Sequence, residues 1–209
     1  AVIDSLLSQI PSMFVESRET ETVLGPVIQA GLDALKSADR AGKLYIFHTS
    51  LPIAEAPGKL KNRDDRKLLG TEKEKTILTP QNNFYTKLGQ ECVAEGCSVD
   101  LFLFPNAYID VATISEVSRL TGGSVYKYSY FQADLDGDRF LEDLRRNVQN
   151  QSAFDAILRV RTSTGIRPVD FYGNFYMSNT TDVEMAAVNS DDALNVEIKH
   201  DDKLSEGDG

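Results

Sequence analysis

The chain has 209 residues, of which 41% are hydrophobic and 26% charged, a composition typical of a globular protein and incompatible with wholesale disorder. Its 22 Lys and Arg against 32 Asp and Glu give a formal charge of −10, the opposite of the balance that a nucleic-acid binder usually carries. No apolar run approaches the roughly 18 residues of a membrane span. The apolar N-terminal stretch carries Asp4 and no basic residue, so we do not expect a signal peptide.

The first 150 residues predict helices that alternate with short apolar strands. Apolar residues recur at helical spacing over 2–14, 22–37, 84–95, 111–120 and 138–150. Apolar runs predict buried strands over 43–50, 97–105 and 124–131, with about thirty loop-like residues after the first of them. Strands that alternate with helices indicate a mostly parallel, Rossmann-like sheet with helices on both faces.

The pattern changes after residue 150. Four strand candidates follow, separated by short turn sequences of Ser, Thr, Gly, Asn and Asp: 154–165, 166–178, 181–188 and 193–200. This predicts antiparallel structure, and we divide the chain into an α/β part, residues 1–150, and a β part, residues 151–209. Because four strands make a poor independent domain, we expect the β part to pair with strands outside this chain.

Metal ligands with suitable spacing are absent from the sequence. Cys92 and Cys97 are its only cysteines, and we interpret them as buried free thiols, because zinc needs four Cys or His ligands and the two histidines are far apart. The acidic stretch 134–143 departs from the EF-hand pattern, since Gly137 falls at its fourth position and Arg145 at its twelfth. We interpret this stretch as a polar loop whose Asp residues cap the next helix, and we expect no metal and no cofactor in this chain.

Catalytic motifs are equally weak. His48 ends a predicted strand, where a side chain of a doubly wound enzyme could line a crevice, but a packed histidine is the simpler interpretation. The segment 121–124, Thr-Gly-Gly-Ser, leads from helix to strand, whereas a phosphate cradle needs the reverse order. A metal-dependent adhesion module would need an Asp-x-Ser-x-Ser triplet, which the sequence lacks.

Two groups of basic residues are the remaining candidate sites. The loop 58–75 holds seven basic and four acidic residues, so it is either a solvated loop or a contact for a partner or an anionic membrane. Its candidate contacts are Lys59, Lys61, Arg63, Arg66 and Lys67. In the β part, Arg159 and Arg161 would share one face of a strand about 7 Å apart, either as an ordinary polar face or as a receptor for paired carboxylates.

Long stretches of the sequence resemble the cargo-adaptor subunit of the COPII vesicle coat. They are LPIAEAPGKLKNRDDRKL (51–68), VDLFLFPNAYIDVATISEVSRLTGGSVYKY (99–128), FDAILRVRTSTGIRPVDFYGNFYMSNTTDVE (154–184) and EIKHDDKL (197–204). The first stretch is similar to the subclass that vertebrates carry as the third and fourth paralogues. The resemblance implies a von Willebrand A-like trunk, incomplete at its N-terminal side, followed by part of a β-sandwich. The zinc ribbon of that family would lie outside this chain.

The resemblance also implies a function. It implies a non-enzymatic adaptor that pairs with a GTPase-activating COPII coat subunit and selects membrane cargo during budding from the endoplasmic reticulum (ER). Such a protein is cytoplasmic and peripheral on ER exit sites and COPII vesicles, against an anionic ER membrane surface. Arg159 and Arg161 are similar to family residues that help bind acidic export signals. The competing hypotheses are an enzyme on a doubly wound sheet and a metal-dependent adhesion module.

Overall fold

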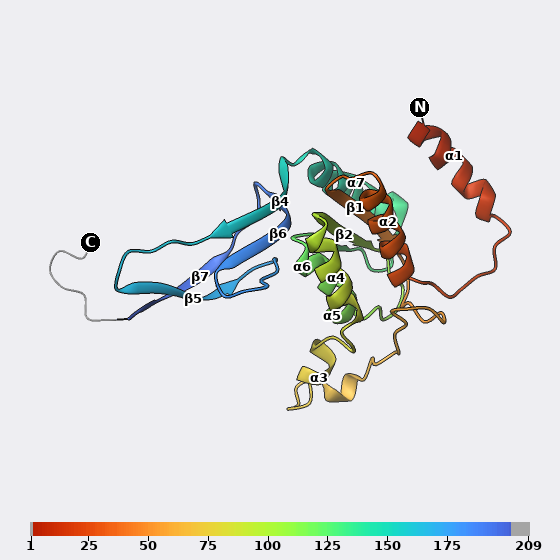
Figure 1. Ribbon diagram of the computed structural model, residues 1–209. Helices are drawn as coiled ribbons and strands as arrows, with labels where there is room; N and C mark the ends of the chain where they lie inside the picture. The colour runs from red at the N-terminus through yellow and green to blue at the C-terminus, as the bar shows by residue number, and fades with distance from the viewer. Residues whose placement is uncertain (1, 202–209) are drawn as a thin grey trace.

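The computed structural model describes residues 2–201, and its α/β part is built on a three-stranded parallel sheet (Figure 1). The strands are β1 (Gly42–His48), β2 (Cys97–Leu103) and β3 (Val125–Lys127), in the order β1-β2-β3. β2 pairs with β1 from Gly42↔Cys97 to His48↔Leu103. Every residue of β2 is buried, as expected for the central strand of a parallel sheet.

Helices cover both faces of this sheet, which confirms the predicted α/β architecture. On one face, α2 (Gly25–Ser37), α4 (Phe84–Ala94) and α6 (Glu116–Leu120) pack against the side chains of Val99, Leu101 and Leu103 of β2. Phe102 points to the opposite face, because side chains alternate along a strand. There it contacts Phe140 of α7 (Ala133–Gln149), with ring centroids 6.0 Å apart.

Several element bounds differ from those expected. The predicted helix 22–37 begins at Gly25, and the predicted strand 124–131 keeps only the three residues of β3. The predicted helix 111–120 is divided at Ser115 into α5 (Val111–Ile114) and α6. The helix expected over 138–150 begins at Ala133, so the acidic stretch 134–143 lies within α7 and the expectation of a loop was wrong. Asp136 accepts a hydrogen bond from the Gln132 backbone N–H at 2.9 Å, and acidic residues in a first turn favour the helix.

Two segments extend from this body in Figure 1. The predicted N-terminal helix forms as α1 (Val2–Phe14), but none of its residues is buried in the described structure. The long loop between β1 and α4 contains a 3-10 helix, η1 (Arg66–Leu68), and the short helix α3 (Lys75–Leu78). We call residues 59–80 of this loop the arm. Among the described residues, no helix is long and apolar enough to cross a bilayer.

The β part consists of two antiparallel ribbons. β4 (Ser152–Arg159) pairs with β6 (Asp182–Asn189), and β5 (Ile166–Tyr172) pairs with β7 (Asn195–His200). A small apolar core lies around Phe175, Val183 and Met185 and takes side chains from both ribbons. The antiparallel prediction is confirmed, although consecutive strands do not pair, so the turn between β4 and β5 does not close a hairpin.

The segment 121–124 joins the two parts. The Thr121 carbonyl oxygen accepts a hydrogen bond from the backbone N–H of Ala187 on β6 at 3.3 Å. The Thr121 hydroxyl accepts from Val99 N–H of β2 at 3.1 Å and donates to the Val117 carbonyl at 2.8 Å. Asn150, after α7, hydrogen-bonds with Asn189 at the end of β6 and with Ser190 and Asp191 in the turn that follows. The parallel sheet and the β4-β6 ribbon are therefore joined by hydrogen bonds from the residues that follow α6 and α7.

Candidate functional site

Arg159, the last residue of β4, already holds a carboxylate of its own chain. In the β4-β6 ladder it lies opposite Asp182. Its Nε donates to Asp182 Oδ1 at 2.5 Å and its Nη2 to Oδ2 at 2.6 Å. The Arg159 side chain nevertheless remains 48% exposed, and a guanidinium has five donors. Arg159 can therefore bind a second carboxylate, to which its remaining N–H groups would donate.

Arg161 lies two residues beyond the end of β4, so the two arginines do not share a strand face as the sequence suggested. It is exposed, and within residues 2–201 no hydrogen bond or ion pair engages its side chain. The hydrogen bonds from Arg159, with its charge and that of Arg161, hold the pKa of Asp182 below its usual range. Around this carboxylate the site consists of one arginine that is partly engaged and one that is open.

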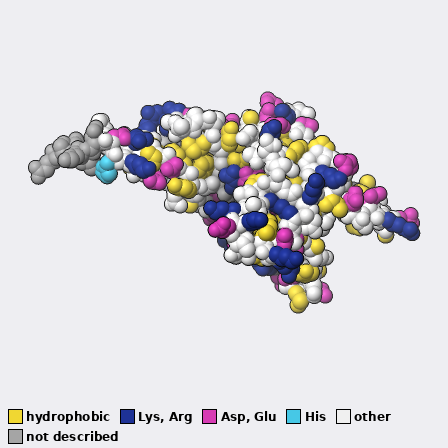
Figure 2. Space-filling view, turned by 90° about the horizontal axis from the view of Figure 1, so that it is seen from below, with side chains coloured by type: hydrophobic (Ala, Val, Ile, Leu, Met, Phe, Trp, Pro, Cys, Tyr) yellow, Lys and Arg dark blue, Asp and Glu magenta, His cyan; other side chains and the backbone are white. Residues whose placement is uncertain are grey.

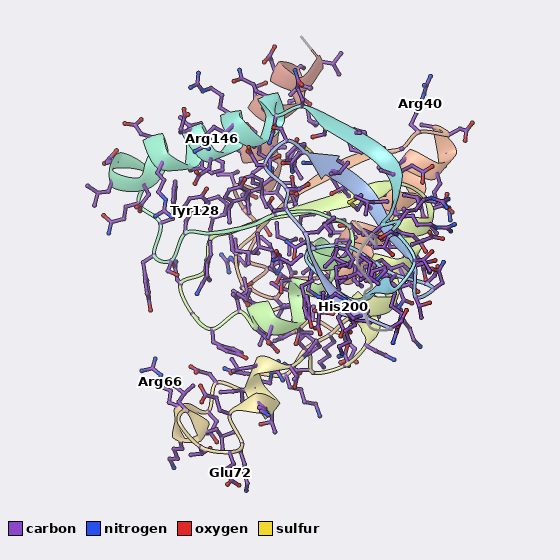
Figure 3. All side chains as sticks on the ribbon, turned by 90° about the vertical axis from the view of Figure 1, so that its left-hand side faces the viewer. Arg40, Arg66, Glu72, Tyr128, Arg146 and His200 are labelled. Carbon is purple, nitrogen blue, oxygen red and sulfur yellow. The ribbon has the colours of Figure 1, made fainter. Side chains whose placement is uncertain are left out.

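The predicted contact residues of the arm differ in how far their own chain engages them. Lys61, Arg66 and Lys67 are exposed, and no ion pair engages their side chains within the described residues, whereas Lys59 pairs with Glu55. Figure 3 shows Arg66 at the tip of the arm near Glu72, away from the body. These exposed residues agree with a surface contact, but their partner stays a prediction.

Arg63 differs from the other arm cations because it is a structural anchor. Its side chain is 18% exposed, and its Nη2 lies 2.8 Å from Oδ1 of Asp110, which is fully buried. Its Nε donates to Asp110 Oδ2 at 2.9 Å, and its Nη1 donates to the Thr76 carbonyl at 2.8 Å. Its Nη2 also reaches the Thr79 carbonyl at 2.5 Å. Arg63 was among the predicted contacts for a partner or a membrane, but its guanidinium is used to hold Asp110 and the arm.

His48 does not line an open crevice. Its side chain is 6% exposed, and its Nε2 has no hydrogen-bond partner among the described residues. Burial lowers the pKa of His48, and a backbone hydrogen bond to Ser50 opposes this effect only in part. The structure thus gives His48 the role of a packed, neutral side chain.

This burial predicts a pH dependence of stability. The folded pKa of His48 lies below the unfolded value of about 6.5, so the unfolded chain binds the extra proton first as the pH falls. Below about pH 6.5 we expect His48 to remove up to about 1.4 kcal/mol of unfolding free energy per pH unit, until its folded pKa is reached. Urea unfolding between pH 7.5 and 5.5 measures this loss, and His48→Leu should lose less. Parallel pH curves for the two proteins would show that His48 does not titrate differently on folding.

The two cysteines are buried and free, as expected. A hydrogen bond with Cys97 and burial raise the pKa of the Cys92 thiol. Among residues 2–201 there is no group of three or more His, Cys, Asp or Glu side chains that could hold a metal ion.

The two acidic partners that define these sites were not predicted from the sequence. Asp182 is 23 residues from Arg159, and only the register of β4 with β6 identifies it. Asp110 is 47 residues from Arg63 and adopts a left-handed conformation with φ 48°. A weak local signal existed for Asp110, because Asp tolerates that conformation better than most residues and it directly precedes a helix.

Comparison with known proteins gives matches across the chain. A family model described as the Sec23/Sec24 trunk domain matches residues 1–148, and one described as the Sec23/Sec24 beta-sandwich domain matches residues 153–209. Human protein transport protein Sec24C is 68% identical over 209 residues, which are 100% of this chain and 19% of the relative. Human Sec24D is 61% identical over 100% of this chain and 20% of its own length. SEC24 B of Arabidopsis thaliana is 37% identical over 98% of this chain and 19% of its own length.

A solved structure, that of the human COPII-coat protein Sec24c, superposes with a TM-score of 0.97 at 67% sequence identity. The superposition covers 100% of this chain and 28% of that one. The chain therefore spans about a fifth of the length of the curated relatives it matches.

Proposed function

The chain belongs to the Sec23/Sec24 family, and on that premise we propose that the protein carrying it is a non-enzymatic cargo adaptor of the COPII coat. It selects membrane cargo through short cytosolic export signals during budding from the ER. Whole-chain identity to relatives named protein transport proteins supports this role. We assign residues 1–150 to the trunk and 151–209 to the β-sandwich, and no cofactor to either.

The proposed partners are a GTPase-activating coat subunit, the anionic ER membrane surface and cargo signals. The protein would work in the cytoplasm, on ER exit sites and COPII vesicles. The observation that carries the cargo role is the exposed Arg161 beside the half-exposed Arg159, an arrangement that offers charge-assisted donors to an acidic signal. Asp182 competes for Arg159, which makes the site weaker than two open arginines would be.

We expect an acidic peptide with an Asp-x-Glu signal to bind mainly through Arg161. A charge-assisted hydrogen bond is worth roughly 1.5–3 kcal/mol, so Arg161→Ala should weaken binding about tenfold or more. Arg159→Ala should weaken it less, because the Arg159 Nε and Nη2 already bind Asp182. Asp182→Asn should tighten binding, because it removes the competing charge. Peptide titration by calorimetry at physiological salt measures all three.

The matched control is Arg145→Ala. Arg145 is an exposed arginine on α7 that pairs with the Glu142 carboxylate at 2.9 Å, as Arg159 pairs with Asp182, but it lies outside the proposed site. This variant should bind the peptide like the wild type. Circular dichroism checks that every variant is folded. A folded double variant, Arg159→Ala with Arg161→Ala, that binds the peptide as tightly as the wild type would place the cargo site elsewhere.

A further inference from the structure

We propose that the arm, residues 59–80, is a pre-organised docking element that presents Leu69 and Leu78 to a folded protein partner whose apolar contact surface is bordered by acidic side chains. The inference rests on the proposed function, because the partner used to test it is the coat subunit named there. It adds the residues that make the contact and the anchor that positions them.

The base of the arm is fixed by hydrogen bonds to the trunk. Arg63 joins both limbs of the arm to Asp110, since it also binds the Thr76 and Thr79 carbonyls. On the returning limb, Gln81 donates from Nε2 to Asp110 Oδ2 and to the Lys61 carbonyl, both at 2.6 Å. A loop held in this way loses less conformational freedom on binding than a free loop of the same length.

The tip of the arm, residues 64–75, is ordered by its own polar groups. The Asp65 side chain accepts from Lys67 N–H at 3.1 Å, and Glu74 Oε2 accepts from Gly70 N–H at 3.1 Å. The Thr71 hydroxyl donates to the Leu68 carbonyl at 2.7 Å. The arm therefore keeps its shape without burying Leu69 and Leu78, which stay 54% and 64% exposed. A partner that buries apolar side chains held on an ordered segment avoids part of the entropic cost of ordering them.

The charges of the tip favour a protein over a membrane. Two acidic side chains of the tip, Asp65 and Glu74, accept hydrogen bonds from backbone N–H groups. Within residues 2–201, no hydrogen bond or ion pair engages the four cationic side chains of the tip. These are Arg66, Lys67, Lys73 and Lys75. Each of these unengaged cations can pair with an acidic side chain on a partner, although acidic residues lie between them in the sequence.

A membrane responds mainly to net charge, and residues 64–75 carry four basic and four acidic side chains. On the face shown in Figure 2, Lys and Arg side chains alternate with Asp and Glu, and no broad field of one sign is visible. Interleaved charges can be paired one by one by a protein surface, whereas they give little net attraction to anionic lipid.

The test compares the double variant Leu69→Ser, Leu78→Ser with the matched double variant Leu135→Ser, Leu141→Ser. Leu135 and Leu141 are leucines of α7 that are 77% and 59% exposed. Both double variants are made in the full-length polypeptide that carries this chain. Binding to the purified coat subunit is measured by biolayer interferometry, and sedimentation with vesicles of phosphatidylcholine and phosphatidylserine is measured in parallel. We expect the arm variant to bind the subunit at least tenfold more weakly, with unchanged melting and vesicle binding, and the α7 variant to bind like the wild type.

Equal subunit binding by the arm variant and the wild type would overturn the inference. So would a loss confined to vesicle binding, which would make the arm a membrane element. An equal loss of subunit binding in the α7 variant would show that exposed leucines contribute nonspecifically, and it would also overturn the inference. If the wild type itself does not bind the subunit, the partner part of the proposed function fails together with this inference. Failure of the acidic-peptide titration alone contradicts only the cargo role.

Discussion

Arg63→Leu is expected to lower the free energy of unfolding by about 3–5 kcal/mol, the usual cost of removing one partner from a buried ion pair. The fully buried Asp110 carboxylate would keep neutral donors, the Gln81 amide and the Thr113 and Tyr108 hydroxyls. Their hydrogen bonds do not replace a guanidinium that binds both carboxylate oxygens. The loss should appear as a lower urea midpoint with an unchanged slope.

The control is Arg119→Leu. Arg119 also makes two hydrogen bonds to one carboxylate, that of Glu116, but its side chain is 47% exposed. Because exposed ion pairs contribute little, this variant should stay within about 1 kcal/mol of the wild type. Arg63→Leu combined with Asp110→Asn should cost less than the sum of the single variants, because they share one interaction. An Arg63→Leu protein as stable as Arg119→Leu would mean that Asp110 is not a buried charge.

This anchor changes the design of any experiment on the arm. Charge reversal of all five predicted contacts would include Arg63 and would place a second carboxylate beside Asp110. Loss of partner binding could then result from unfolding of the arm. Reversal restricted to the exposed Lys61, Arg66 and Lys67 separates the surface contact from the structural role.

The α/β part could be predicted closely because its signals are local. β1 and β2 are mostly apolar runs, and α2 and α4 repeat apolar residues at helical spacing. β3 was predicted too long, because the run after Val125 leaves the sheet after three residues and its aromatic Tyr128 packs instead against Phe140 of α7. Apolar character alone does not distinguish a strand from a buried loop.

The pairing of the β part and the partners of the arginines could not be predicted in this way. β4 pairs with β6 and β5 with β7, so each ladder joins segments separated by another strand. Arg159 and Arg161 were recognised by spacing, but the engagement of Arg159 depends on a register with Asp182 that no local pattern contains. Arg63 similarly looked like one more loop cation until Asp110, contributed by a distant segment, was placed beside it.

The second large effect is expected at Gly122 and Gly123, where the two parts of the chain meet. A Cβ on Gly123 would lie 2.0 Å from the Val99 carbonyl oxygen, and one on Gly122 would lie 2.3 Å from the Ala187 carbonyl oxygen. Both neighbours are backbone atoms of strands, so they cannot move aside as a flexible side chain would. Gly122 also has φ 69°, which costs an L-residue roughly 1–2 kcal/mol in addition to roughly 1–3 kcal/mol for overpacking.

We therefore expect Gly122→Ala to lower the free energy of unfolding by about 2–5 kcal/mol and Gly123→Ala by about 1–3 kcal/mol. Gly137→Ala is the matched control, because Gly137 lies within α7 and a Cβ there meets nothing within 4 Å. That change should stabilise the protein by about 0.5–1 kcal/mol, since alanine has the higher helix propensity. Urea unfolding of the three variants measures the order of their unfolding free energies. If Gly122→Ala and Gly137→Ala were equally stable, the close contact between the segment 121–124 and β6 would not exist in solution, and the trunk and the ribbon would not be joined there.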